Sequence, residues 1–315
     1  TFILVDNSSV ALGYMASAFF GNPSQRLKLV GITGTNGKTT TVTLLYRLAR
    51  RMGHKAGLLS TVVNYINDVE VPSTHTTPDP IQLNALLKQM VDTGCDYCFM
   101  EVSSHSVVQN RIAGLTFAGG IFSNITHDHL DYHKTFGEYL KAKKRFFDHL
   151  PADAFALTNA DDRNGMVMVQ NTKAKVYTYS LRSMADFRCK VIENHFDGMM
   201  LNIDGVEVWT RLLGRFNAYN LLAIYSTLLL LGFEKNEVLT GISDVTPVSG
   251  RFEYVRSGHG VTAVVDYAHT PDALENVIKT INEIKSDDQR LITVVGAGGN
   301  RDKTKRPVMA KVATE

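Results

Sequence analysis

The stretch Leu27-Lys-Leu-Val-Gly-Ile-Thr-Gly-Thr-Asn-Gly-Lys-Thr-Thr-Thr41 decides the fold. Its first half is apolar and predicts a buried strand. A glycine-rich turn follows, and residues 39–51 then show the pattern of an amphipathic helix. Strand, glycine-rich loop and helix in this order predict a phosphate-binding loop, because backbone N–H groups of the loop and of the helix N-terminus can face an anion.

Two side chains of this loop carry the expected chemistry. Lys38 is expected to reach the β- and γ-phosphates of a nucleotide, and the Thr39 hydroxyl is expected to ligate Mg²⁺. The loop is tighter than the common form, because Ile32 stands where a glycine usually lies five residues before Gly37. We expect ATP or GTP binding, while a glycine-rich turn without a nucleotide remains the alternative at this point.

The composition is that of a soluble globular protein with more than one domain. The chain has 315 residues, 44% hydrophobic and 20% charged, and a net charge of +2, which gives no reason to expect nucleic acid or a membrane as partner. The longest apolar run, 221–231, is too short to cross a bilayer, and polar residues interrupt the first apolar residues, so no cleavable signal is expected. The Cys count is three, which favours a reducing compartment, and Cys95 and Cys98 are expected to be inert buried thiols.

Strands and helices alternate along most of the chain. Helices are expected over 39–52, 80–93, 136–149, 217–232 and 235–243, and strands over 55–59, 96–102, 117–122 and 154–158. This alternation predicts an α/β fold with a mostly parallel sheet and helices on both faces. Residues 174–213 instead show short strands and tight turns, which predict an antiparallel insert or a sheet edge.

The two ends of the chain differ from its centre. Residues 1–5 are expected to form a strand and 8–20 a helix with Val10, Leu12, Met15 and Phe19 on one apolar face, before a linker at 22–24. A second linker at 246–250 precedes an expected strand (261–266), helix (271–284) and strand (291–296). We therefore expect the start of a second, incomplete α/β domain, with divisions at 1–26, 27–246 and 247–315.

Several polar clusters follow strands or lie on helices. Glu101 ends an expected core strand, where an NTPase places a Mg²⁺ ligand, although a surface or capping acid is the alternative. Residues 124–133 hold three His and two Asp, which suggests a metal or phosphate site. Zinc is one option, a single imidazole on Mg²⁺ fits better, and a solvated polar loop is the alternative. Taken alone, three other stretches are weak signals: the charged helix 139–145, Asp266-Tyr-Ala-His-Thr-Pro271 and the glycine-rich turn 296–303.

Together, these motifs resemble those of one family, the Mur ligases, which are bacterial ATP-dependent amide-forming enzymes of peptidoglycan synthesis. Residues 33–39 are similar to the phosphate loop of that family. Residues 101–105, 109–111 and 128–133 are similar to those of the members that add the third residue of the stem peptide. Residues 266–271 and 298–307 are similar to motifs of their C-terminal domain, so the resemblance covers the chain from about residue 5 onward.

The resemblance implies a fold and a set of functional residues. The fold would be a central P-loop NTPase-like sheet followed by a truncated Rossmann-like α/β domain. Lys143 is the last residue of a Tyr-x-x-Ala-Lys pattern and, by register, is preferred over Lys141 and Lys144 as the lysine that CO₂ converts to a carbamate. The catalytic residues would be Lys38, Glu101, His129 and Lys143, and the Mg²⁺ ligands Thr39, Glu101, His129 and the Lys143 carbamate.

Two binding sets follow from the same resemblance. The residues expected to hold ATP are Gly34, Thr35, Asn36, Gly37, Lys38, Thr39, Thr40, Asn217, Asn220, Arg251 and Asp266. The residues expected to hold the muramoyl peptide are His75, Thr76, Thr77, Ser103, Gln109 and Arg111.

The implied reaction is ATP-dependent addition of a diamino acid, meso-diaminopimelate or L-lysine, to UDP-N-acetylmuramoyl-L-alanyl-D-glutamate through an acyl phosphate. It implies two Mg²⁺ ions, a cytoplasmic monomer, no nucleic acid and no membrane insertion, and a role in cell wall synthesis, cell shape and division. Only the tail of a uridine-binding domain and none of the amino-acid-selecting segment is expected in the chain, so the added amino acid stays open. A folylpolyglutamate or cyanophycin synthetase-like ligase and a nucleotide-binding module without ligase activity are the alternatives.

Overall fold

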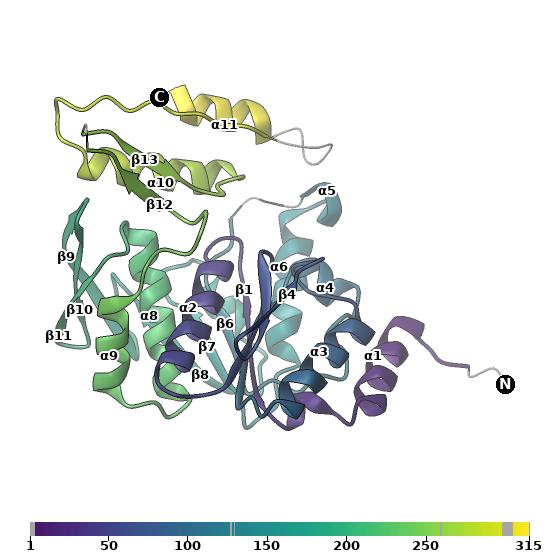
Figure 1. The fold of residues 1–315 in the computed structure, drawn as a ribbon. Helices are drawn as coiled ribbons and strands as arrows, with labels where there is room; N and C mark the ends of the chain where they lie inside the picture. The colour runs from purple at the N-terminus through teal and green to yellow at the C-terminus, as the bar shows by residue number, and fades with distance from the viewer. Residues whose placement is uncertain (1–3, 127, 129, 259, 298–304, 315) are drawn as a thin grey trace.

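An eleven-stranded sheet forms the centre of the computed structural model, which describes residues 4–126, 128, 130–258, 260–297 and 305–314 (Figure 1). The strand order is β11-β10-β9-β8-β7-β6-β1-β5-β2-β3-β4. All neighbouring pairs from β9 to β2 are parallel. The parallel strands other than β9 are β1 (Lys28–Thr33), β2 (Ala56–Leu59), β5 (Tyr97–Glu101), β6 (Gly119–Phe122), β7 (Phe155–Asn159) and β8 (Lys175–Ser180).

Helices cover both faces of the sheet, as the alternation predicts. One hydrophobic core lies beneath α2 (Lys38–Arg51), α8 (Arg215–Leu230) and α9 (Lys235–Asp244), and the other beneath α3 (Pro80–Asp92) and α6 (Phe136–Asp148). The shorter helices are α4 (Ser104–Val108), α5 (Leu130–His133), α7 (Gly165–Met168) and the 3₁₀ turn Pro23–Gln25. Among the residues that the structure describes, no helix is both long and apolar enough to cross a membrane.

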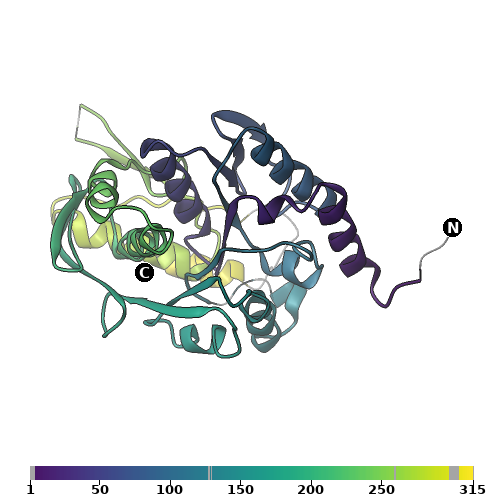
Figure 2. The same cartoon turned by 90° about the horizontal axis from the view of Figure 1, so that it is seen from below.

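Both edges of the sheet are antiparallel. The edge expected between 174 and 213 is made of β9 (Phe187–His195), β10 (Gly198–Ile203) and β11 (Val206–Thr210), whereas β8 belongs to the parallel part. The edge strands β9–β11 and the N-terminal helix α1 lie at opposite ends of the molecule in both views (Figures 1 and 2). The other edge is the hairpin of β3 (Val63–Ile66) and β4 (Val69–Pro72), which the sequence pattern does not predict because its strands are short and carry polar residues.

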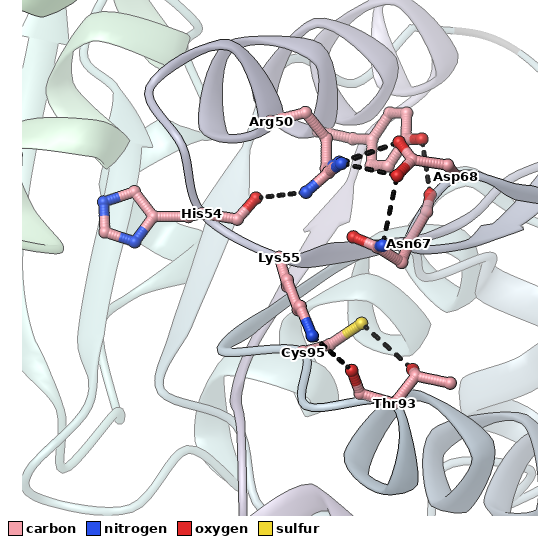
Figure 3. A network of polar contacts seen from close by, with 8 residues as sticks. Arg50, His54, Lys55, Asn67, Asp68, Thr93 and Cys95 are labelled. Carbon is pink, nitrogen blue, oxygen red and sulfur yellow. Dashed lines mark hydrogen bonds and ion pairs between the residues drawn. The ribbon is translucent and has the colours of Figure 1, made fainter.

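Polar contacts hold this hairpin against the end of α2 (Figure 3). The Arg50 guanidinium donates to Asp68 at 2.7 Å and to the carbonyl of His54 at 2.9 Å. The Tyr46 hydroxyl donates to the carbonyl of Asn67 at 2.7 Å. Lys55 and Cys95 extend the network to Thr93, at the end of α3. Cys95 and Cys98 are buried free thiols, as expected, and burial raises the pKa of Cys98 well above its ordinary value.

The N-terminal helix α1 (Ser8–Phe19) is present, but the prediction of its buried face is wrong. Its buried residues are the small ones, Gly13, Ala16 and Ser17, while Leu12, Met15 and Phe19 are exposed. The reason is close approach: a Cβ on Gly13 would lie 2.6 Å from the carbonyl oxygen of Ala113. Only small side chains fit this contact, so the large ones face outward. Residues 4 and 5 are not in a strand, and residues 1–3 lie outside the described part of the chain.

A small C-terminal unit lies beyond the carboxyl edge of the sheet (Figure 1). It contains a hairpin of β12 (Glu253–Arg256) and β13 (Thr262–Val265), followed by α10 (Pro271–Ile284) and α11 (Lys305–Thr314). The predicted helix 271–284 is confirmed, but the predicted strand 291–296 is wrong. In the described part of the unit β13 pairs only with β12, so residues 291–296 have no strand beside them, and Ile292 and Val294 are exposed.

Gly31, in the middle of β1, offers a test of the packing. A Cβ on Gly31 would lie 2.7 Å from Phe146 and 2.9 Å from Phe117, so Gly31→Ala should lower the free energy of unfolding by about 1–3 kcal/mol. Gly137 in α6 is exposed, and a Cβ there would make only an ordinary contact, 3.9 Å from Thr135 Oγ1, so Gly137→Ala should be neutral or stabilise by up to about 1 kcal/mol. Urea unfolding of both variants measures the difference, and equal effects would contradict this account of the β1–α6 packing.

Candidate active site

A cavity of about 990 Å³ opens at the carboxyl edge of the sheet. Its floor is the meeting point of three parallel strands, because Ile32 of β1 pairs with Glu101 of β5 on one side and with Ile121 of β6 on the other. Residues of α8 and α10 also line the cavity. The carboxyl ends of parallel strands are where α/β sheets bind ligands, so the position fits the prediction of a nucleotide site.

The phosphate loop is held from behind by the residues that follow β6. The Asn36 N–H donates to Asn124 Oδ1 at 2.9 Å, and Ser123 Oγ donates to the carbonyl of Asn36 at 2.7 Å. Gly37 has φ +88°, and a Cβ there would lie 2.4 Å from Asn220 Oδ1. Both the backbone angle and the close approach therefore require glycine just before α2 begins at Lys38.

Lys38 lies folded against its own loop. Its Nζ donates to the carbonyls of Gly34 at 2.9 Å and of Thr35 at 2.8 Å. Burial lowers its pKa, while the carboxylates of Glu101 and Asp128 act in the opposite direction. Thr35, Asn36, Thr39 and Thr40 line the same cavity with Gly34 and Gly37, so the whole expected loop faces one space.

Thr39 and Glu101 form a buried pair of oxygen ligands. Thr39 Oγ1 donates to Glu101 Oε1 at 2.9 Å, and the Thr61 N–H donates to the same oxygen at 2.8 Å. The Arg251 guanidinium donates to Thr39 Oγ1 at 3.0 Å, which brings a residue of the C-terminal unit to the loop. Glu101 is only 1% exposed, so it is not the surface acid of the alternative. A hydroxyl beside a carboxylate is a donor set that suits Mg²⁺.

Lys143 of α6 lies at the wall of this cavity. It is 1% exposed, and its Nζ donates to the carbonyl of Gly34 at 2.7 Å and lies 4.7 Å from the centre of the Tyr139 ring. Burial, and then the charge of Lys38, holds its pKa well below the ordinary value for lysine. Lys141 and Lys144 instead pair with acids of their own helix, Glu138 and Asp148, outside the cavity.

The residues expected to hold a muramoyl peptide gather beside Glu101. Arg111 donates to the carbonyl of Thr77 at 2.7 Å and to Gln109 Oε1 at 2.9 Å. Thr77 Oγ1 accepts from the N–H of Ser103 at 3.2 Å. His75, Thr76, Thr77, Ser103 and Arg111 line the cavity, whereas Gln109 is exposed outside it and contacts Arg111, which does line it.

The opposite end of the cavity holds the residues expected around the nucleoside. Asn220 Nδ2 donates to Asn217 Oδ1 at 3.1 Å, and both side chains are buried on α8. Asp266 accepts from the N–H of Phe252 at 2.7 Å, and burial raises its pKa. The Arg251 guanidinium lies 4.7 Å from the centre of the Tyr267 ring.

Some expected residues lie outside the described part of the chain. His129 is one, as are His127 and residues 298–304 of the C-terminal glycine-rich motif. Asp128 is buried and has Lys305 of α11 at 3.6 Å. Within the described residues, no group of three or more His, Cys, Asp or Glu side chains could hold a metal ion, so the zinc option has no support there.

The sequence analysis missed acids that follow β7. Asp161 accepts from Ser180 Oγ at 2.6 Å, from the Leu181 N–H at 2.8 Å and from the Tyr219 hydroxyl at 2.8 Å, and it lines the cavity. Burial alone would raise its pKa, but these hydrogen bonds together outweigh burial and lower it. A sequence signal for these acids is present, because the predicted strand 154–158 is followed by Asn159-Ala-Asp-Asp162, just as β5 ends with Glu101.

Family models match two stretches of the chain. Residues 32–228 match the Mur ligase middle domain, and residues 250–315 match the Mur ligase glutamate ligase domain. The UDP-N-acetylmuramoyl-L-alanyl-D-glutamate–2,6-diaminopimelate ligase of Cytophaga hutchinsonii is 62% identical over all 315 residues. The chain spans 65% of the length of that relative.

Solved structures with the same fold include ligases of different substrates. A structure of a UDP-N-acetylmuramoyl-L-alanyl-D-glutamate–2,6-diaminopimelate ligase matches with a TM-score of 0.78 and 30% identity, covering 100% of this chain and 67% of that one. Folylpolyglutamate synthase of Mycobacterium tuberculosis matches with a TM-score of 0.69 and 16% identity, covering 87% of this chain and 70% of that one. The second match is a likeness of fold alone.

The burial of Lys143 predicts a stability effect. In the unfolded chain this lysine has a pKa of about 10.4, and in the native chain its pKa is lower. Between these two pKa values the unfolded chain binds more protons than the native chain, so native stability falls as the pH falls through this range. Lys143→Met removes this pH-dependent loss of stability, and the Gly34 carbonyl still accepts a hydrogen bond from Lys38. In CO₂-free buffer at pH 7 we expect stabilisation on the order of 1–4 kcal/mol, shrinking as pH rises toward 10.

Thermal unfolding between pH 6 and 10 measures this difference. Lys141→Met is the matched control, because Lys141 is exposed and its replacement should change stability by no more than about 0.5 kcal/mol. A Lys143→Met protein that is less stable than the wild type at pH 7 would show that burial of this amine carries no net cost.

Proposed function

The chain belongs to the Mur ligase family, and on that premise we propose that the protein is the ATP-dependent ligase that joins 2,6-diaminopimelate to UDP-N-acetylmuramoyl-L-alanyl-D-glutamate in peptidoglycan synthesis. The relative from Cytophaga hutchinsonii carries this name. The observation that carries the proposal is the meeting of Lys38, Lys143 and the Thr39–Glu101 pair around one cavity, beside Thr77 and Arg111.

The domain division proposed for this function follows the expectation from the sequence. Residues 1–26 would end a uridine-binding domain, 27–246 would form the central ATP-binding domain, and 247–315 would begin the C-terminal ligase domain. Support comes from the two family matches, because one ends at residue 228 and the other begins at residue 250. The loop between them, at residues 246–250, would then act as a hinge.

The reaction needs activation, because a carboxylate is a poor electrophile toward an amine. In the proposed mechanism, a carboxylate oxygen of the substrate attacks the γ-phosphorus of ATP and ADP leaves. The amine of the diamino acid then attacks the carbonyl of the acyl phosphate, loses a proton and displaces inorganic phosphate. Lys38 would stabilise the charge on the transferring phosphoryl group, and the N–H groups of the loop would orient it.

Two Mg²⁺ ions are proposed as cofactors, with support from the Thr39–Glu101 pair, whose oxygen donors suit this cation. Thr39 and Glu101 would ligate the metal, together with His129 and a carbamate on Lys143. Bound Mg²⁺ would neutralise charge on the phosphates and on the attacking carboxylate. The low pKa of the Lys143 amine supports the carbamate, because CO₂ adds to a neutral amine, and the product is an anion that can hold a cation.

The remaining assignments are made for the same reaction. Asn217, Asn220, Arg251 and Asp266 would hold the nucleoside and phosphates of ATP, and the cluster around Arg111 would hold the muramoyl dipeptide, with Gln109 orienting Arg111. Because the proposed substrates are ATP and a UDP-linked precursor, the reaction would take place in the cytoplasm. We further propose that the protein acts as a monomer.

The first experiment measures phosphate release from ATP by the full-length protein. We expect release only when UDP-muramoyl dipeptide and 2,6-diaminopimelate are both present, and little with lysine, glutamate or alanine. Lys38→Ala should reduce the rate by at least about 10³-fold, because the loop cation is lost. Release stimulated by lysine instead of 2,6-diaminopimelate would show that lysine is the amino acid that the protein adds. Release that no muramoyl peptide stimulates would overturn the proposal and favour a folylpolyglutamate or cyanophycin synthetase-like ligase or a nucleotide-binding module.

A second experiment tests the carbamate. Lys143→Ala should lower the rate by about 10²-fold or more, and short carboxylates such as acetate should restore part of it, because they can supply an anion in the vacated space. Lys144→Ala is the matched control, since Lys144 pairs with Asp148 away from the cavity. Unchanged turnover of Lys143→Ala would contradict the assignment.

A further inference from the structure

The first turn of α10 touches the phosphate loop. Asn36 Nδ2 donates to Asp272 Oδ2 at 2.8 Å, although the two residues lie far apart in sequence and in different parts of the fold. Asp272 is the second residue of α10, which begins at Pro271 with Thr270 as its N-cap. This contact therefore joins the C-terminal unit directly to the loop that is expected to hold the phosphates.

The other contacts of Asn36 show what this hydrogen bond adds. The backbone of Asn36 is held by Ser123 and Asn124, both of which follow β6 in the central part of the chain. The side-chain amide is held from the opposite side, by Asp272. The loop is thus fixed between two parts of the fold, and one of the two restraints exists only while the C-terminal unit lies against it.

The same junction encloses the cavity. Asn276, Val277 and Thr280 of α10 line the cavity together with Asn217 and Asn220 of α8. A shift of α10 away from the loop would therefore open the nucleoside end of the cavity and release the Asn36 amide in one movement.

We propose that Asp272 is a positioning residue that couples docking of the C-terminal unit to the conformation of the phosphate loop, and thereby sets the affinity for ATP. The inference rests on the ATP site of the proposed function. The apparent dissociation constant of a ligand rises in proportion as the fraction of protein in the competent conformation falls. A contact that favours the docked state therefore tightens ATP binding without touching the nucleotide.

The negative charge of Asp272 would weaken ATP binding, whereas its hydrogen bond to Asn36 would strengthen it, and the experiment must separate the two effects. A carboxylate close to a phosphate site repels the ligand, and Glu275 and Asp162 add further negative charge nearby. The side-chain amide of Asn36 acts in favour of the carboxylate by hydrogen bonding. Asp272→Asn removes the charge and keeps an oxygen that can accept from Asn36, whereas Asp272→Ala removes both.

The experiment is a double-mutant cycle on ATP affinity, measured by titration calorimetry with Mg²⁺ and the full-length protein. Asp272→Ala and Asn36→Ala should each weaken ATP binding about tenfold, and the double variant should be no more than about twofold weaker than either single variant. Asp272→Asn should stay within about twofold of the wild type. The KM for ATP should rise with Asp272→Ala more than kcat falls.

Glu275→Ala is the control for negative charge alone, because Glu275 lies near Asp272 in the same turn of α10 but is exposed and does not line the cavity. Thermal unfolding of each variant shows that it is folded. Tenfold losses that multiply in the double variant would overturn the inference, as would tighter binding in both Asp272→Ala and Asp272→Asn. A wild-type protein that fails to bind ATP would instead overturn the proposed function.

Discussion

The site depends on the burial of β1 between β5 and β6. Because this strand is covered on both edges and both faces, the point where it ends is fixed, and the loop after Thr33 must turn at that point. The register with β5 places the Glu101 carboxylate beside Ile32 and within reach of the Thr39 hydroxyl. Gly37 then turns the chain so that α2 begins with Lys38 facing its own loop. The geometry of the phosphate and metal residues thus follows from strand pairing.

The parts of this arrangement that depend on local pattern were predictable from the sequence. The strand–loop–helix order around Lys38, the acid that ends β5 and the helix that carries Lys143 are all encoded within about fifteen neighbouring residues. The longer central helices and the parallel strands β2, β5, β6 and β7 are predicted to within about two residues for the same reason. Lys143 is preferred over Lys141 and Lys144 in the sequence only through the register of the family pattern. The structure shows that it shares the buried face of α6 with Tyr139, Ala142, Phe146 and Phe147.

Features that depend on tertiary partners were not predictable in this way. The strand expected at 291–296 has the right composition, but a strand also needs a neighbour, and the pairing of β13 with β12 could not be known from the apolar pattern. The face of α1 was assigned by hydrophobicity, whereas a close backbone approach at Gly13 decides it. The role of Asp272 arises from Asn36 in the loop, which is distant in sequence, whereas Asp161 has a local signal at the end of β7.

Lys38 and Lys143 show how function and stability oppose each other at this site. Lys38 and Lys143 both donate to the carbonyl of Gly34, so two amines share one acceptor. Each pKa is lowered by burial, and the positive charge of Lys38 lowers that of Lys143 further. A hydrophobic side chain at either position would pack without this cost. Two such lysines are expected where an anion is bound. A phosphate beside Lys38 would offset the cost of removing its charge from water, and a negative charge on Lys143 would remove the repulsion between the two amines. Together with the Thr39–Glu101 pair, the two lysines favour a site that binds anions and a metal together.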